Sequence, residues 1–362
     1  SSSGFWYLSR YDDVEAVLRN RDLGRNFRDF LQAQYGDGPL LHRFQSSMLY
    51  LDPPDHQRLR SLVTRAFNAK RVADMEPRIH AIADVLIDAM QAKGHAELVA
   101  DFAHPLPATV ISEMIGIPLE DRDLLRAWTE DLARGLEFMV TPEQAEAGNR
   151  AADGMTDYML RLIDRRRCDP GDDLIDALIA AEEAGGRLSD EELVTICALL
   201  FVAGHETTKS LIASTVLALL RSPSERALLA ERPDLAPGVV QEVLRYESPV
   251  QMTARRAVSE IRIGGRDIGA GDVVVLLLGA ANRDPSHYDD PDRLDVRRDG
   301  RPPLAFGGGI HFCLGAALAK AETEIAVNAL LRRLLAMELA TERIAWRPTA
   351  TLRGVQCLEV GF

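Results

Sequence analysis

Residues 306–315 read F-G-G-G-I-H-F-C-L-G, and the cysteine in this stretch is the residue around which we place the rest of the chain. Gly307, Gly308 and Gly309 allow backbone conformations that other residues avoid, and a close approach to a flat ligand. Residues 314–338 have a helical pattern, so Cys313 stands at a helix start, where the macrodipole and unpaired N–H groups favour a thiolate. This setting alone allows a metal ligand, a nucleophile or a redox thiol.

Several function classes are disfavoured. The loop lacks the Lys-Ser/Thr ending of a phosphate loop. The chain has 362 residues and a formal net charge of −13, whereas nucleic acid and anionic membranes require a basic surface. Its four cysteines form no C-x-x-C pair, which fits a reducing cytoplasm. Neither a signal peptide nor a run of eighteen apolar residues is visible, so we expect a cytoplasmic protein that does not span a membrane.

The first third of the chain predicts a small strand-helix unit followed by helices. Residues 5–9 are strand-like and residues 12–19 helical. Residues 20–50 have a weak pattern broken by glycines, which predicts a mobile loop: either an ordinary surface connection or the lining of a ligand cavity. His56 and Arg60 lie four apart on the next predicted helix, 56–67, where they can hold a carboxylate or form plain solvated surface. Further helices are predicted at 75–90, 107–115, 120–137 and 142–166.

A long apolar helix is predicted after residue 189. Ser189 and Glu192 form a capping box, and the apolar pattern continues for about 32 residues, roughly 48 Å. Its middle reads A-G-H-E-T-T at 203–208, where a glycine costs about 1 kcal/mol relative to alanine. Polar groups in so apolar a helix indicate a functional site, and a small-residue packing notch is the alternative. His205-Glu206 is not a zinc motif, because position 209 is Lys209.

The segment before the cysteine loop predicts a short helix and a small sheet. Glu242 and Arg245 lie three apart on a helix at 239–246, and an isolated surface pair of this kind contributes only a few tenths of a kcal/mol. Residues 261–268 with a Gly264-Gly265 turn, 273–278 and 358–361 have strand character. Residues 282–300 form a long loop.

The order A-G-x-E-T, E-x-x-R and F-G-x-G-x-H-x-C-x-G resembles the cytochrome P-450 family over residues 5–362. Six fixed residues in the cysteine loop recur by chance at about 10⁻⁸ per start position. The resemblance implies a mainly α fold with a small β region, triangular, with a long central helix and a buried haem. It also implies one catalytic domain, residues 1–362, lacking the family's usual N-terminal first helix and first strand.

The resemblance assigns the cofactor contacts. Cys313 is implied as the axial thiolate of the iron in haem b, where it donates electrons. Glu242 and Arg245 are implied as a buried structural network joined by residues 295–297. The other implied haem contacts are His56, Arg60, Arg255 and His311 for the propionates, and Phe306, Gly307, Gly315 and Ala203 around the cofactor.

Glu206 and Thr207 match the family's acid-alcohol pair, which implies proton delivery to bound dioxygen. Lys209 departs from the pattern one turn later: it either extends to the surface, which we expect, or reaches Glu206. Leu294 and Glu359 stand where an aromatic residue and a proline are common. Implied substrate contacts are apolar: the 20–50 loop, residues 136–140, Val202, Val250, Met252, Thr351 and Leu352.

The resemblance implies a mono-oxygenase that inserts one oxygen atom from O2 into a lipophilic molecule of secondary metabolism, by hydroxylation or epoxidation. A terpenoid, steroid, macrolide or fatty acyl compound fits the apolar contacts. Electrons would come from a ferredoxin-type donor with its reductase, docking near a basic patch of Arg65, Lys70, Arg71 and Lys320. A peroxide-driven peroxygenase and a haem-based binder are the alternatives, and the intact Glu206-Thr207 pair argues against both.

Overall fold

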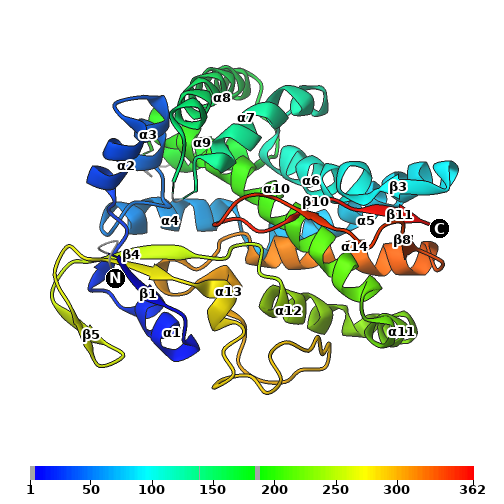
Figure 1. Cartoon of the computed structure of the whole chain (residues 1–362). Helices are drawn as coiled ribbons and strands as arrows, with labels where there is room; N and C mark the ends of the chain where they lie inside the picture. The colour runs from blue at the N-terminus through cyan, green and yellow to red at the C-terminus, as the bar shows by residue number, and fades with distance from the viewer. Residues whose placement is uncertain (1–4, 138, 184–187) are drawn as a thin grey trace. The chain divides into compact units, whose positions relative to one another are not determined.

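The computed structural model describes residues 5–137, 139–183 and 188–362, which fall into two units. Unit 1 comprises Ser1–Leu23, Asp74–Pro107 and Glu206–Phe362, and unit 2 comprises Gly24–Ala73 and Ala108–His205. The chain passes from one unit to the other within α5 (Ala69–Lys93), within α6 (Pro105–Ile115), and within α10 (Asp190–Leu220), which Figure 1 shows as one uninterrupted helix.

Unit 2 is helical. In Figure 1, α7 and α8 lie side by side, and Gly148 of α8 brings that helix against Leu40, since a Cβ there would lie 2.7 Å from Leu40 Cδ2. A capping box starts α8: the Gln144 N–H donates to Thr141 Oγ1 and the Thr141 N–H to Gln144 Oε1. Besides parts of α5, α6 and α10, the helices are α2 (Arg28–Tyr35), α3 (Pro39–Gln45), α4 (Asp55–Ala66), α7 (Arg122–Arg134), α8 (Pro142–Cys168) and α9 (Leu174–Glu183), with a 3-10 turn at Leu119–Asp121.

The prediction of a mobile loop over residues 20–50 is wrong, because the segment contains α2 and α3. Leu31 and Tyr35 of α2 lie one turn apart and are buried, as are Leu40, Leu41 and Phe44 of α3. Gly36 adopts φ +65° at the end of α2, and Pro39 occupies the first turn of α3. The glycines therefore separate two short helices. The sequence pattern was weak because each helix has only two turns.

Unit 1 contains the sheets. Strand β7 pairs in parallel with β1 and antiparallel with β4, and α1 packs on this sheet through Tyr11, Val14, Val17 and Leu18. Gly264 and Gly265, both with positive φ, form the predicted turn between β5 and β6. The strands are β1 (Phe5–Leu8), β2 (Leu23–Gly24, at the unit boundary), β3 (His95–Glu97), β4 (Thr253–Ala257), β5 (Ile261–Ile263), β6 (Arg266–Ile268), β7 (Val273–Leu276), β8 (Glu338–Leu339), β9 (Ala345–Trp346), β10 (Val355–Cys357) and β11 (Glu359–Gly361).

Two of the remaining helices of unit 1 lie where helices were predicted, at residues 12–19 and 239–246, whereas α11 (Pro223–Glu231) and α13 (Leu278–Ala281) were not predicted. The helix after the cysteine begins at Ala316 and stops at Arg333, whereas the pattern predicted it to residue 338. Leu334 leaves the helical conformation, and Glu338 belongs instead to β8 in the order β3-β11-β8. The helices are α1 (Tyr11–Arg19), α11 (Pro223–Glu231), α12 (Ala236–Tyr246), α13 (Leu278–Ala281) and α14 (Ala316–Arg333), with a π-helical turn at Val99–Ala103 and 3-10 turns at Pro233–Leu235, Leu304–Phe306 and Gly309–His311.

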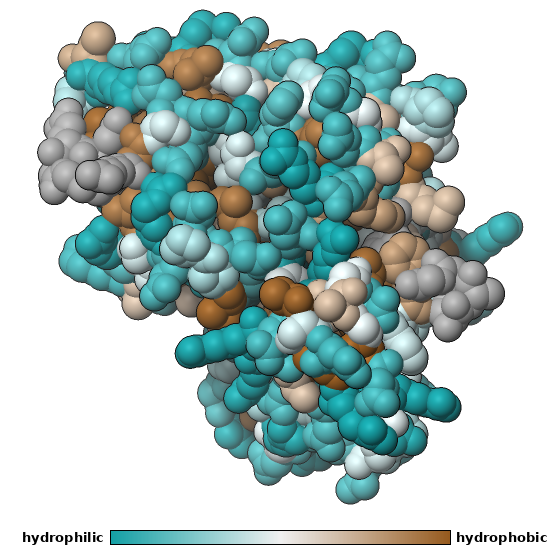
Figure 2. All heavy atoms as spheres, turned by 90° about the vertical axis from the view of Figure 1, so that its left-hand side faces the viewer, coloured by the Kyte–Doolittle hydropathy of each residue, from teal (hydrophilic) through white to brown (hydrophobic). Residues whose placement is uncertain are grey.

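Helix α10 begins as predicted. The Glu192 N–H donates to Ser189 Oγ at 3.2 Å, and the Ser189 N–H donates to Glu192 Oε2 at 2.9 Å, which closes the capping box. By length and composition alone this helix is apolar enough to cross a membrane, yet 78% of its most apolar window is buried inside the protein. Packing in the protein interior thus accounts for its apolarity. Figure 2 shows hydrophilic side chains over most of the face in view, with apolar side chains in small separate groups.

Candidate active site

The cysteine loop is shaped by its glycines and by α1. Gly307 and Gly309 have φ of +70° and +65°, and a Cβ on Gly309 would lie 2.3 Å from the Leu18 carbonyl oxygen. No larger residue fits there without moving backbone. The Cys313 N–H donates to the Phe306 carbonyl at 3.0 Å, which folds the loop back on itself. Cys313 is half-buried and precedes α14 by three residues, so the predicted position at a helix start holds.

Aromatic side chains surround this turn. The Phe306 ring meets that of Phe312 edge-on with centroids 6.3 Å apart, and Lys320 Nζ lies 5.7 Å from the Phe306 centroid. Phe312 remains 46% exposed. The loop therefore presents a partly open aromatic surface next to Cys313, as a flat apolar ligand requires.

Glu206 is buried between two cations. Its carboxylate is 2% exposed; Lys209 Nζ lies 2.6 Å from Oε1 and Arg347 Nη1 lies 2.7 Å from Oε2. The expectation that Lys209 extends to the surface is wrong: the residue is 9% exposed and reaches Glu206, because α10 is buried at that point. Sequence reasoning missed Arg347, which follows β9 and has no periodic relation to α10.

The next feature is the face of α10 that carries Thr207. Ala203 is exposed and Gly204 and Thr207 are partly exposed, although Val202, His205 and Glu206 beside them are buried. Residues four apart share a helix face, so Ala203 and Thr207 lie on the same, incompletely buried face of α10. Gly204 has a packing role within unit 2, since a Cβ would lie 2.9 Å from Ile111 Cγ1 of α6. The Gly204 contact thus agrees with the packing notch that was the alternative interpretation.

The predicted propionate ligands come from both units. In unit 2, His56 is 2% exposed in the first turn of α4, one turn before Arg60. Burial lowers the pKa of His56, as do the positive charges of Arg60 and Arg25, while Asp52 opposes them. The imidazole is therefore kept neutral among cations. Sequence reasoning missed Arg25, because it precedes α4 by thirty residues.

In unit 1, Arg255 and His311 are placed by different elements. Arg255 is 3% exposed on β4, where Nη1 donates to the Ala254 carbonyl at 2.8 Å. His311 lies in the 3-10 turn two residues before Cys313. A buried arginine and a histidine beside the cysteine are the kind of groups that bind a carboxylate.

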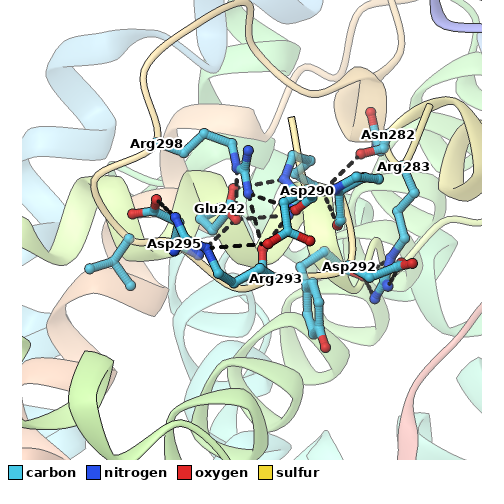
Figure 3. A network of polar contacts seen from close by, with 12 residues as sticks. Glu242, Asn282, Arg283, Asp290, Asp292, Arg293, Asp295 and Arg298 are labelled. Atoms are coloured by element: carbon cyan, nitrogen blue, oxygen red, sulfur yellow. Dashed lines mark hydrogen bonds and ion pairs between the residues drawn. The ribbon is translucent and has the colours of Figure 1, made fainter. Parts of the chain in front are cut away.

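Glu242 and Arg245 form the predicted buried pair. Arg245 Nε and Nη2 each donate to a Glu242 carboxylate oxygen at 2.8 Å, and both side chains are almost fully buried. Figure 3 shows Arg298 turned toward Glu242; the backbone N–H of Asp295 donates to Glu242 Oε1 at 3.0 Å, and Arg298 Nε donates to the same oxygen at 3.1 Å. The sequence analysis did not predict Arg298 as a member of this network. The network anchors the 282–300 loop to α12.

Two of the predicted substrate segments meet in unit 1. The Gln251 N–H donates to the Thr351 carbonyl at 2.8 Å, and Val250 forms an isolated antiparallel bridge with Leu352. Met252 and Thr351 are partly exposed beside this bridge. Val202 belongs to α10 in unit 2 and is 8% exposed. The predicted segment 136–140 includes Phe138, which lies outside the described residues.

The model of the cytochrome P450 family matches residues 2–342, so the chain belongs to the cytochrome P450 family. It is 42% identical to cytochrome P450 107B1 of Saccharopolyspora erythraea over 98% of this chain and 88% of that protein. It also matches the solved structure of P450BioI in complex with an acyl carrier protein that bears hexadec-9Z-enoic acid, with a TM-score of 0.94 and 39% identity, over 99% of this chain and 92% of that chain. A second match is the structure of myxobacterial CYP267B1 with myristic acid, with a TM-score of 0.92 and 44% identity, over 99% of this chain and 90% of that chain.

Members of this family are haem-thiolate mono-oxygenases, and the cofactor of this chain is haem with Cys313 as the axial ligand. The residues fit that group. In unit 1, the loop before Cys313 contains Gly307 and Gly309 with positive φ beside the exposed Phe312 ring, and the buried Arg255 of the same unit is suited to a carboxylate. The mainly α fold with a small strand region agrees with the prediction.

Proposed function

We propose that this chain is an O2-dependent cytoplasmic mono-oxygenase that hydroxylates or epoxidises an apolar small molecule, using electrons from a ferredoxin-type donor and its reductase. The family supports the mono-oxygenase class. The substrate segments support an apolar ligand, because Val250, Met252 and Leu352 are aliphatic. When bound, haem supplies the activation of dioxygen.

We assign proton delivery to Glu206 and Thr207. Thr207 Oγ1 lies on the partly exposed face of α10, and the next residue back is a buried carboxylate held by Lys209 and Arg347. A hydroxyl can pass a proton onward without admitting bulk water, while the carboxylate replenishes it. This adjacent acid and alcohol is the observation that carries the proposal, since a peroxide-driven enzyme or a haem-based binder has no need of protons delivered to dioxygen.

Removing the Thr207 hydroxyl tests this assignment. In Thr207→Ala we expect reductant consumption to continue while the ratio of product to reductant falls about tenfold and hydrogen peroxide rises, because general acid catalysis contributes at least that much. Thr208→Ala is the matched control, since Thr208 is the neighbouring buried threonine on another face. If the ratio of product to consumed reductant is the same in Thr207→Ala and Thr208→Ala, Thr207 is rejected as a proton donor.

The same assay separates the competing functions. Product formed only with ferredoxin, reductase and O2 supports the mono-oxygenase, whereas equal product from hydrogen peroxide alone identifies a peroxygenase. Ligand binding without any turnover identifies a binder.

We propose fatty acyl chains as the first substrate class to test. Two of the similar structures hold such chains, hexadec-9Z-enoic acid on a carrier protein in one and myristic acid in the other. Substrate-induced spin-state shifts, compared between fatty acids and polycyclic compounds of similar size, measure the preference. A shift seen only with polycyclic compounds would reject the acyl class.

A further inference from the structure

His104 brings an imidazole to the buried carboxylate of Glu206. Both residues belong to unit 1, and a ring nitrogen of His104 lies within 4.8 Å of a Glu206 carboxylate oxygen. A direct hydrogen bond or one bridging water covers such a separation. The sequence pattern did not reveal this neighbour, because the two residues belong to segments that are far apart in the chain.

The local backbone places His104 between solvent and the protein interior. His104 follows the π-helical turn Val99–Ala103 and precedes the proline that begins α6. Its N–H donates to the Val99 carbonyl at 2.8 Å, which closes this wide turn. Turns of this kind are frequent at functional sites. The residue is partly exposed, although Phe102 and Ala103 before it are buried, so its imidazole can exchange protons with water.

Lys209 and Arg347, which also contact Glu206, are poor proton donors at neutral pH. An arginine keeps its proton throughout the physiological range, and a lysine ammonium ordinarily releases its proton only at high pH. An imidazole, in contrast, gains and loses a proton near neutral pH. The two cations also outnumber the single carboxylate charge, and their repulsion disfavours a metal ion at this place.

Two other titratable groups near His104 in the sequence or on α10 have different roles. Asp101, on the same π-helical turn, accepts a hydrogen bond from Lys93 Nζ at 3.1 Å. His205 of α10 is 1% exposed, and its Nδ1 donates to the Phe201 carbonyl at 2.8 Å. So deeply buried an imidazole is poorly placed to take protons from water, whereas the partly exposed His104 is well placed to do so.

We propose that His104 supplies protons from solvent to the relay formed by Glu206 and Thr207. The imidazolium of His104 gives its proton to the Glu206 carboxylate, the resulting acid passes it to Thr207, and the neutral imidazole takes another proton from water. The relay needs such an entry residue because the Glu206 carboxylate is 2% exposed. His104 thus acts through Glu206. The proposal rests on the proposed function for the reaction that consumes the protons.

The first test compares His104→Gln with the parent holoenzyme, supplied with ferredoxin, reductase, O2 and myristic acid. Reduction of one O2 by two electrons takes up two protons, whether it yields oxygenated product with water or hydrogen peroxide. We therefore expect reductant consumption to fall about tenfold when proton entry is slow. The dependence of this rate on pH across the neutral range should also weaken. The Kd of myristic acid and the reduced carbon-monoxide spectrum should stay unchanged, which separates proton supply from a structural defect.

Two further variants provide controls. His80→Gln removes an exposed histidine of the same unit and should leave the rate and its pH profile unchanged. His104→Glu retains a side chain that takes up and releases protons, so it should recover most of the rate. This variant also covers the case in which His104→Gln folds poorly.

The second test requires no turnover. Nitrogen NMR of the histidine rings, in the carbon-monoxide complex of the reduced protein, follows the titration of His104, whose resonances are assigned by their loss in His104→Gln. We expect Glu206→Gln to move this titration to lower pH, because a neighbouring carboxylate favours the imidazolium form. The titration of His80 should be unchanged in Glu206→Gln.

The outcomes distinguish this proposal from the proposed function. Equal rates and pH profiles in His104→Gln and His80→Gln, or a His104 titration that Glu206→Gln leaves in place, would overturn the proposal. A parent protein that forms product from hydrogen peroxide alone, and none from reductant and O2, would instead overturn the proposed function on which the proposal rests.

Discussion

Two buried glutamates of unit 1 differ in their surroundings: one is paired with cations, and the other is surrounded by groups that offer it no hydrogen bond among the described residues. Glu206 of α10 is 2% exposed and has a cation on each carboxylate oxygen, Lys209 on one and Arg347 on the other. Glu322 of α14 is fully buried, and within the described part of the chain neither of its oxygens has a hydrogen-bond partner. Burial raises the pKa of Glu322 well above its ordinary value.

The difference shows that burial alone does not determine the charge of a carboxylate. Removing an ion from water costs several kcal/mol, which neighbouring cations offset at Glu206 and which protonation avoids at Glu322. Helix α10 therefore holds a charge-compensated carboxylate next to Thr207, the residue to which we assign proton delivery. Helix α14, which follows Cys313, instead holds a carboxyl group whose pKa is raised by burial, so its neutral form is favoured.

The largest expected effect comes from making Glu206 resemble Glu322. In the double variant Lys209→Met and Arg347→Met, we expect the free energy of unfolding at neutral pH to fall by about 3–5 kcal/mol, because a buried carboxylate loses its compensating charges. Chemical denaturation followed by circular dichroism measures this. Adding Glu206→Gln should recover most of the loss, since no charge then remains to be compensated. A triple variant as unstable as the double variant would show that packing, and not charge, holds this site.

A smaller effect is expected at Glu322, and it depends on pH. Because the folded-state pKa lies above the unfolded value near 4.5, the native state holds a proton that the unfolded chain releases, and stability falls as pH rises between the two values. Relative to Glu322→Gln, the parent protein should lose about 1.4 kcal/mol per pH unit in this window. Denaturation curves at a series of pH values upward from the unfolded pKa measure the slope. Parallel pH profiles of the two proteins would mean that Glu322 is ionised.

The smallest effect is expected for an exposed pair. Arg262 and Asp267 on the β5-β6 hairpin lie 3.1 Å apart with side chains 69% and 62% exposed. Water screens such a pair, so Arg262→Gln should change the free energy of unfolding by less than about 0.5 kcal/mol. This exposed pair is the reference for the two buried glutamates. A larger loss of stability in Arg262→Gln would mean that charge contributes to stability independently of burial.

Features that depend on neighbours along the chain were predictable. The capping box of Ser189 and Glu192 is such a feature, as are the turn at Gly264 and Gly265 and the pair Glu242 and Arg245, because each involves groups at most a few residues apart. The cysteine loop was recognisable for the same reason, since its glycines, aromatic residues and Cys313 act within ten residues.

The sequence by itself thus determined the class of protein, the cysteine that binds haem and the helix that carries Glu206 and Thr207. The tertiary structure decided which charges those residues meet. Arg347 reaches Glu206 from 141 positions away, the charge of Arg25 acts on His56 from a separate segment, and Lys209 turns inward because α10 is buried there. Helical and turn periodicities act over a few residues, whereas these contacts depend on how distant segments pack, and packing leaves no periodic pattern in the sequence.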